Sequence, residues 1–170
     1  MPEVETSMTT MENLKAAFAG ESQANRSYLA FAQKAEEEGY PQVAKRFRVA
    51  AESETIHALK HLKTMGKVGS TADNLAAAIN GENYEHTSMY PEFMEIAEGE
   101  GEKKAKEAFR RANEAEKFHE KMFAEAAAQP GEVADKRYFV CQECGMTYEN
   151  EAPGECVVCG HAKEYITEVA

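Results

Sequence analysis

Apolar residues recur at helical spacing through most of the first 128 positions, with charged residues on the opposite faces. This period predicts four long helices, over residues 9–38, 42–65, 73–98 and 102–128. Helix-breaking residues separate the segments, at Gly39, Pro41, Gly66, Gly99 and Gly101. Pro91 lies inside the third segment, where its missing N–H predicts a kink or a local bulge.

Each predicted helix carries one glutamate on its otherwise mostly apolar face: Glu21, Glu54, Glu82 and Glu116. An isolated ionised carboxylate in a low-dielectric interior costs several kcal/mol, and neighbouring carboxylates also repel one another. The alternative is that each glutamate lies at the edge of its stripe and reaches solvent, as most helical glutamates do. For the repeated set, two divalent metal ions are the better explanation, because their charge removes most of the conflict.

The spacing of these glutamates predicts a dimetal site. Glu-x-x-His occurs at Glu54–His57 and again at Glu116–His119, and each copy follows a separate glutamate by just over thirty residues. Positions i and i+3 share one face of a helix, so each pair directs a carboxylate and an imidazole to one point. Two such pairs with two further carboxylates can hold two metals.

The repeat extends beyond these ligands. Four positions of the first half recur at an offset of 62, namely Tyr28, Phe31, Gly39 and Phe47 as Tyr90, Phe93, Gly101 and Phe109. Gly20-Glu21 recurs at an offset of 61 as Gly81-Glu82, so one residue has been inserted before Tyr90. The second half also gains Glu85, three positions after Glu82. The two halves are therefore similar but not equivalent.

All four cysteines lie in a short segment beyond Pro130-Gly131, as two Cys-x-x-Cys-Gly motifs: Cys141, Cys144, Cys156 and Cys159. In a reducing compartment this pattern favours metal thiolates over disulfides. The glycine after each motif permits the left-handed backbone of a metal-binding knuckle. The spacing predicts a tetrahedral four-thiolate site, but it does not separate structural zinc from iron.

Charge and composition limit the partners. A net charge of −11 over 170 residues argues against nucleic acid and anionic membrane surfaces, whose phosphates would repel the chain. The first residues show neither a cationic segment nor an apolar run, so we expect no secretory signal or membrane span and a cytoplasmic location.

The chain closely resembles the rubrerythrin family over residues 9–170. Four segments ahead of the paired cysteines carry the likeness: Gly20-Glu21-Ser22-Gln23-Ala24, Gly81-Glu82-Asn83-Tyr84-Glu85, Met89-Tyr90-Pro91 and Glu116-Lys117-Phe118-His119-Glu120-Lys121. The resemblance implies an all-α ferritin-like four-helix bundle over residues 1–130, followed by a small rubredoxin-like β/knuckle domain over residues 136–170. It also implies iron at both sites, with zinc as an alternative occupant.

Roles for single residues also follow from the resemblance. It makes Glu54 and Glu116 bridging ligands, Glu21 and Glu82 terminal carboxylates, and His119 a nitrogen ligand. Glu85 and His57 are the pair that exchange on one iron when the oxidation state changes. Imidazole tolerates the ferrous state better than hard carboxylates do, which gives the exchange a chemical reason.

Other residues near these ligands are less specific. Tyr28 and Tyr90 resemble hydrogen-bond donors to the carboxylates, although each could equally be a core aromatic with a satisfied hydroxyl. We interpret His61 as structural or partly exposed, and we assign no role to His86 or His161.

The resemblance implies a non-haem diiron peroxidase in oxidative-stress protection, which reduces hydrogen peroxide to water. Its electrons would pass through the four-cysteine iron from an external rubredoxin or NAD(P)H-dependent reductase. One alternative is a ferritin-like ferroxidase or iron-sequestering protein, although storage needs no dedicated electron inlet. Another is an interaction module whose metal is zinc.

The link between the second and third helices predicts a swapped homodimer. In ferritin-like bundles these two helices run parallel, so the link must cross the bundle. If His57 and Glu82 lie at similar depth, each about nine residues from the nearer helix end, the crossing spans ~27 Å. Seven steps from Gly66 to Asp73 reach at most ~25 Å. We therefore expect helices 1 and 2 of one chain to complete a bundle with helices 3 and 4 of another.

Overall fold

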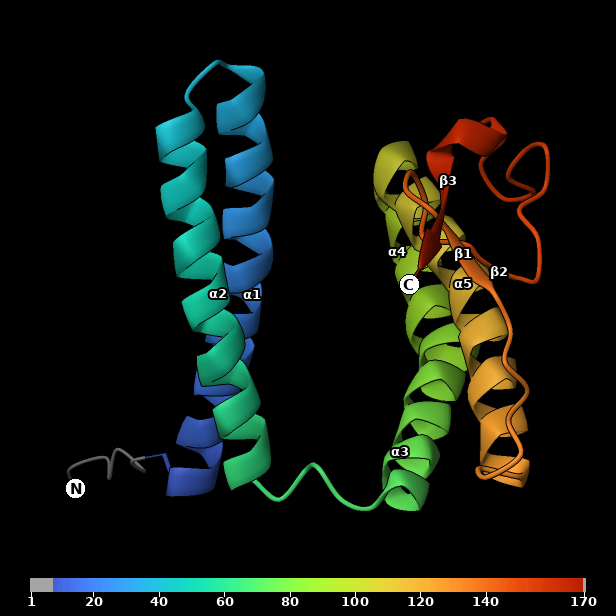
Figure 1. Ribbon diagram of the computed structural model, residues 1–170, viewed down its shortest axis with the longest axis horizontal. Helices are drawn as coiled ribbons and strands as arrows, with labels where there is room; N and C mark the ends of the chain where they lie inside the picture. Colours follow the sequence, from blue (N-terminus) through green and yellow to red (C-terminus); the bar gives the residue numbers. More distant parts are fainter. Residues whose placement is uncertain (1–7, 170) are drawn as a thin grey trace. The chain divides into compact units, whose positions relative to one another are not determined.

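The computed structural model describes residues 8–169, which form two compact units that divide between Gly69 and Ser70 (Figure 1). The first unit is a hairpin of α1 (Thr10–Glu37) and α2 (Pro41–Thr64). The hydroxyl oxygen of Thr9 accepts the N–H of Glu12, and the Glu12 carboxylate accepts the N–H of Thr9 in return. This capping box fixes the start of α1, and Pro41 in the first turn of α2 suits a helix start.

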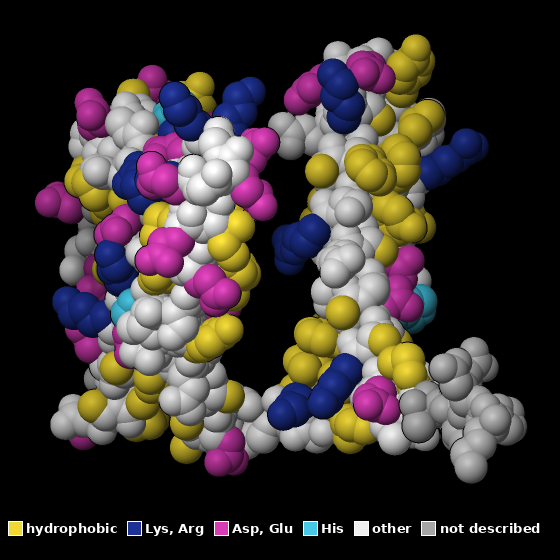
Figure 2. All heavy atoms as spheres, turned by 180° about the vertical axis from the view of Figure 1, so that it is seen from behind, with side chains coloured by type: hydrophobic (Ala, Val, Ile, Leu, Met, Phe, Trp, Pro, Cys, Tyr) yellow, Lys and Arg dark blue, Asp and Glu magenta, His cyan; other side chains and the backbone are white. Residues whose placement is uncertain are grey.

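Small residues let the two helices of this hairpin approach closely. Ala32, Ala35 and Ala44 form its buried core. Near its middle, the buried Asn25 amide donates to the carbonyl of Ala51 at 2.7 Å and to the hydroxyl of Thr55 at 2.8 Å. Large apolar side chains remain exposed within this unit, among them Leu29, Phe31, Val49, Ile56 and Leu59. Figure 2 shows hydrophobic side chains gathered along one face of the unit.

The second unit begins with α3 (Thr71–Tyr84), the π-helix η1 (Glu85–Met89), α4 (Tyr90–Glu100) and α5 (Lys103–Ala128). Ser70 and Asp73 form the capping box of α3. The bulge expected near Pro91 is confirmed, because η1 ends two residues before it, at Met89, and splits the expected third helix in two. Gly101 then closes α4 in the left-handed conformation, with φ of +76°.

The C-terminal module is an antiparallel sheet of β1 (Tyr138–Cys141), β2 (Thr147–Glu149) and β3 (Ile166–Val169), in the order β2-β1-β3. A short 3-10 turn, η2 (Lys163–Tyr165), leads into β3. Phe139, Ile166 and two of the cysteines form the core of the module. The expected helical class with a small β module is therefore confirmed, whereas domain limits at 1–130 and 136–170 stay a prediction.

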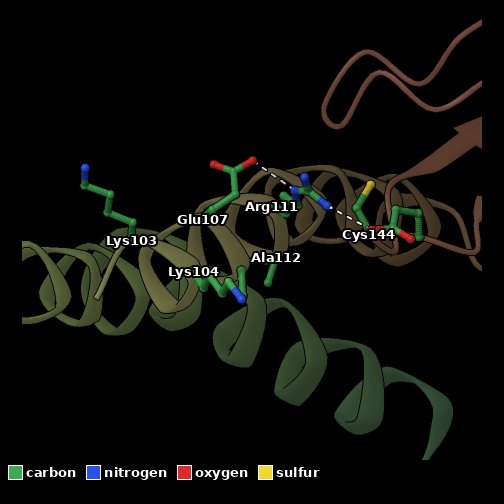
Figure 3. A pocket seen from close by; sticks show the side chains of 8 residues that line it. Lys103, Lys104, Glu107, Arg111, Ala112 and Cys144 are labelled. Carbon is green, nitrogen blue, oxygen red and sulfur yellow. Dashed lines mark hydrogen bonds and ion pairs between the residues drawn. The ribbon is translucent and has the colours of Figure 1, made fainter. Parts of the chain in front are cut away.

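Within the second unit, the C-terminal module packs against α5. Arg110 donates to the carbonyl of Val158 at 3.0 Å, and Arg111 donates to Glu143 at 3.2 Å. Figure 3 shows Arg111 reaching from α5 toward the loop that carries Cys144, with its guanidinium also bonded to Glu107. Across residues 8–169, no helix has both the length and the apolar character needed to cross a membrane.

Candidate metal centres

The first candidate half-site lies within the α1–α2 hairpin. Glu21 on α1 and Glu54 and His57 on α2 each offer a ligand atom, and these three atoms lie within 4.8 Å of one another. The Nδ1 atom of His57 is 2.9 Å from a Glu54 oxygen and 3.7 Å from a Glu21 oxygen. The i and i+3 spacing brings Glu54 and His57 together, and the packing of α1 against α2 adds Glu21.

The two carboxyl groups of this half-site shift each other's pKa in opposite directions. The hydrogen bond to Glu54, together with burial, raises the pKa of Glu21. The same hydrogen bond, helped by His57, lowers the pKa of Glu54. Without a cation, two carboxylates this close cannot both ionise easily.

The second candidate half-site repeats the arrangement with Glu82 on α3 and Glu116 and His119 on α5. His119 Nδ1 lies 2.7 Å from Glu116 and 3.6 Å from Glu82. Burial, and then the neighbouring Glu116, raise the pKa of Glu82 to about 7. The Glu116 carboxylate in turn raises the pKa of His119. The second half-site is the more buried one, since 27% of the His119 side chain is exposed against 52% for His57.

Glu85 and Tyr90 lie close to the second half-site. Burial and the charge of Glu116 raise the pKa of Glu85. Burial also raises the pKa of Tyr90, followed by the charges of Glu116, Glu85 and Glu82. In the part of the chain that the structure describes, the group of ligand atoms within 4.8 Å comprises Glu82, Glu116 and His119 and does not include Glu85.

The two tyrosines occupy equivalent aromatic clusters. The Tyr28 ring lies 6.4 Å from Phe31 and 6.2 Å from Phe47. The Tyr90 ring lies 6.3 Å from both of the matching residues, Phe93 and Phe109. The sequence repeat therefore extends to packing. A hydrogen bond from either hydroxyl to a carboxylate stays a prediction.

The four cysteines form the third candidate centre. Their sulfur atoms lie within 4.8 Å of one another, with Cys141 to Cys159 at 3.7 Å and Cys144 to Cys156 at 3.6 Å, and none is in a disulfide. A tetrahedral ion with Zn–S bonds of ~2.3 Å requires sulfur separations of ~3.8 Å. The four thiols therefore fit a single tetrahedral metal ion.

The environment of these thiols favours at least one thiolate. Burial alone raises the pKa of Cys156, but the Tyr148 hydroxyl and backbone N–H groups outweigh burial and lower that pKa to about 6. Burial raises the pKa of Cys144.

A glycine in the left-handed conformation follows each cysteine pair, Gly145 after the first and Gly160 after the second. The N–H of each glycine donates at 2.8 Å to the backbone carbonyl of the first cysteine of its pair, which closes the loop.

A family model described as rubrerythrin matches residues 12–127. The chain belongs to the rubrerythrin family. The putative rubrerythrin of Methanocaldococcus jannaschii is 36% identical, with 92% of this chain and 90% of the relative covered. Rubrerythrin-2 of Clostridium acetobutylicum is 37% identical, with 91% and 94% covered. Nigerythrin of Nitratidesulfovibrio vulgaris is 36% identical, with 94% and 86% covered.

Solved structures agree with this assignment. Nigerythrin in its fully reduced, all-ferrous state matches with a TM-score of 0.57 at 33% identity, covering 99% of this rubrerythrin-family chain and 91% of that one. The expected fold class is thereby confirmed, including the small sheet with its cysteine knuckles.

Two polar contacts were not predicted from the sequence. His86, to which no role was assigned, lies 2.5 Å from Glu120. Thr147 on β2 lies 3.1 Å from Nε2 of His119. Glu120 follows His119 directly, so adjacency could have drawn attention to it. Thr147 carries no comparable signal, because its partner is 28 residues away on another element.

Proposed function

We propose that this rubrerythrin-family chain is a non-haem diiron peroxidase that reduces hydrogen peroxide to water in oxidative-stress protection. The observation that carries the proposal is the presence, in one chain of this family, of two carboxylate–histidine half-sites and a four-cysteine site. Carboxylate and imidazole donors suit iron at the half-sites, and four thiolates suit iron or zinc. Electrons would come from an external rubredoxin or an NAD(P)H-dependent reductase.

The residues of the half-sites match the charge of two divalent ions. Each half-site offers two carboxylates and an imidazole, so two half-sites bring four negative charges together. We assign Glu54 and Glu116 as bridging ligands and Glu21 and Glu82 as terminal ones, with His119 as the nitrogen ligand. When bound, the two ions supply one electron each, which is what reduction of one peroxide molecule requires.

Glu85 is the residue we assign to proton transfer. Reduction of peroxide to two water molecules consumes two electrons and two protons, so a carboxyl group that holds a proton nearby is required. Burial and the charge of Glu116 raise the pKa of Glu85, so its carboxyl oxygen keeps a proton at a higher pH than an ordinary glutamate does. Tyr90 lies beside the same carboxylates and can orient them, as can Tyr28 in the other half.

His57 is the ligand we assign to the exchange with Glu85. Its side chain is half exposed, and within residues 8–169 its Nδ1 atom is held at hydrogen-bonding distance by the Glu54 carboxylate alone. A ring with so few contacts can leave and return to a metal more readily than the more buried His119.

The two half-sites lie in different units, and the link between the units supports a swapped dimer. If α2 and α3 of one chain ran parallel with His57 and Glu82 at the same depth, the link from Thr64 to Thr71 would have to span ~27 Å. This is the combined length of helix from His57 to Thr64 and from Thr71 to Glu82. Gly66 and Lys67 bond back to Lys63 and Leu62 at the end of α2, and Ser70 caps α3. Only the three steps from Lys67 to Ser70 remain, and they reach at most ~11 Å. We therefore propose that each dimetal site combines α1 and α2 of one chain with α3 to α5 of another.

Anaerobic loading with ferrous iron, followed by peroxide titration, tests the function. We expect one peroxide consumed per two electrons, and sustained turnover when a reduced rubredoxin is supplied. Iron mineral that accumulates without the donor would instead support the iron-sequestering alternative. A colourless protein that retains zinc at the cysteines would support the interaction module.

The proton role of Glu85 has its own test. Glu85→Ala should slow peroxide reduction while both irons stay bound. Glu92→Ala, an exposed glutamate on α4, is the matched control and should leave turnover unchanged. Unchanged turnover in Glu85→Ala would remove the assignment.

A further inference from the structure

The C-terminal module contributes one side chain to the second half-site. Thr147, the first residue of β2, is only 6% exposed, and its hydroxyl oxygen lies 3.1 Å from Nε2 of His119. The same hydroxyl lies 3.4 Å from the carbonyl of Gly145. A threonine hydroxyl has one hydrogen to donate. When that hydrogen is directed to Gly145, the oxygen accepts the Nε2–H of His119.

This arrangement specifies one tautomer of the imidazole. His119 directs its other nitrogen, Nδ1, toward Glu116 and Glu82. A metal held by these carboxylates needs the lone pair of Nδ1, so the ring proton must be on Nε2. The hydroxyl of Thr147 accepts a hydrogen bond from that nitrogen. Such an outer partner fixes both the tautomer and the ring orientation of a metal ligand.

The matching histidine of the first half-site lacks an equivalent partner among the described residues of its own chain. His57 also bonds Glu54 through Nδ1, but among residues 8–169 no side chain or backbone group is hydrogen-bonded to its Nε2 atom. The C-terminal module follows only the second half of the repeat, so the difference arises from the chain itself. One histidine is therefore held at both nitrogens, and the other at one.

Thr147 is also rigidly connected to the four-cysteine site. The N–H of Cys141 bonds the carbonyl of Met146 at 2.9 Å, and the N–H of Gly145 bonds the carbonyl of Cys141 at 2.8 Å. Thr147 pairs with Val140 in the sheet. The knuckle that gathers the thiols therefore also fixes the position of this hydroxyl.

We propose that Thr147 is a positioning residue of the dimetal centre: its hydroxyl holds His119 so that Nδ1 is presented to the metal, and the folded four-cysteine module thereby completes the second half-site. The inference rests on the proposed function only in requiring that this half-site binds a metal. It predicts that metal affinity at the carboxylate–histidine centre depends on a residue of the other module.

Zinc loading of the full-length protein tests the proposal without turnover. Thr147→Val keeps the shape of the side chain and removes the hydroxyl, whereas Thr147→Ser keeps the hydroxyl. Thr167→Val is the matched control, since it removes a hydroxyl on β3 of the same module that accepts from Gln142 at 2.7 Å. Nitrogen NMR follows the Nε2–H of His119, and chelator competition measures zinc affinity at the carboxylate–histidine centre.

We expect Thr147→Val to lose the slowly exchanging Nε2–H signal and to bind zinc at this centre about 10- to 100-fold more weakly. Thr147→Ser should restore both properties, and Thr167→Val should match the unaltered protein. Cobalt absorption at the cysteines should be unchanged throughout, which shows that the module remains folded.

Wild-type behaviour of Thr147→Val, or equal defects in the valine and serine variants, would overturn the inference and leave the proposed function standing. If Thr147→Val loses the signal and the affinity but the unaltered protein turns over no peroxide, the inference stands and the proposed function falls. Absence of zinc from this centre in the unaltered protein would overturn both.

Discussion

Glu82→Gln should stabilise the metal-free protein and weaken the metal-loaded one. The folded protein binds a proton at Glu82 more tightly than the unfolded chain does, because burial and Glu116 raise its pKa from 4.5 to about 7. The resulting stabilisation is fully present below pH 4.5 and is lost as the pH rises through 7. Above pH 7 the metal-free fold must hold an ionised Glu82 beside Glu116. A neutral glutamine avoids this cost and can still donate a hydrogen bond to Glu116.

The size of the effect follows from the pKa. A rise from 4.5 to about 7 corresponds to at most ~3.5 kcal/mol, at about 1.4 kcal/mol for each pKa unit. The Glu82 side chain is 21% exposed, so solvent screening reduces the electrostatic contribution to this free energy. We therefore expect metal-free Glu82→Gln to be more stable than the unaltered protein by about 1–2 kcal/mol at pH 8, with almost no difference at pH 4.

Urea unfolding of the metal-free, reduced protein between pH 4 and pH 8, followed by circular dichroism, measures this difference. Glu95→Gln is the matched control, since it removes an exposed carboxylate on α4 and should leave the pH profile unchanged. With metal bound the sign should reverse, because the variant loses a ligand and with it the stabilisation that binding provides. A metal-free variant that is less stable at pH 8, or whose profile runs parallel to that of the unaltered protein, would refute the electrostatic reasoning.

Three shorter predictions concern the link, a helix end and the thiols. Inserting about twelve flexible residues within 65–70 adds ~40 Å of reach. The proposed swapped dimer should then become a monomer by light scattering and keep its full iron content. An unaltered protein that is already a fully loaded monomer would exclude the swap. Gly101→Ala forces an alanine into the left-handed conformation and should lower the free energy of unfolding by about 1–2 kcal/mol. Gly99→Ala, inside α4, should raise it by about 0.5–1 kcal/mol. Equal melting temperatures of the two variants and the unaltered protein would contradict both expectations. Tyr148→Phe should raise the pKa of the Cys156 thiol above 6 in the metal-free protein, as thiolate absorbance would show, and an unchanged titration would deny the hydroxyl its role.

The half-sites could be predicted from the sequence because their geometry is local. Positions i and i+3 on a helix face the same way whatever surrounds them, so Glu116 and His119 had to lie together once α5 formed. Each cysteine pair is local as well, because a tight turn closed by the N–H of Gly145 or Gly160 brings its two thiols together. The contact of Thr147 with His119 depends instead on how β2 packs against α5, and no period in the sequence reports that packing.

The contact of His86 could be predicted only in part from the sequence. His86 has no counterpart in the repeat, so the sequence gives no indication of its role, and the structure pairs it with Glu120 on α5. Asn83 donates to the same carboxylate at 3.0 Å, so this contact joins α3 and η1 to α5 beside the second half-site. Helical spacing places Asn83 and His86 on one face, but the identity of their partner required the fold.

The π-helix explains why the two halves of the chain differ by one residue. The offset between the halves is 61 at Gly20-Glu21 and 62 from Tyr28 onward, so the extra residue falls between Glu82 and Tyr90. In the structure η1 occupies this interval, and the N–H of Tyr90 bonds the carbonyl of Glu85, five residues back. A π-turn contains one residue more than an α-turn, and Pro91, which has no N–H to continue the α ladder, favours the change.

The inserted residue therefore leaves the aromatic cluster of Tyr90 in the register of its counterpart, Tyr28, as the matching ring distances show. Only the segment between Glu82 and Tyr90 is altered. Glu85 begins that segment, and the first half of the chain has Gln23 and Ala24, not an acidic residue, at the corresponding positions. A single insertion, absorbed within one turn, thus places an additional carboxylate near Glu116 and His119 without shifting the aromatic cluster that follows it in the repeat.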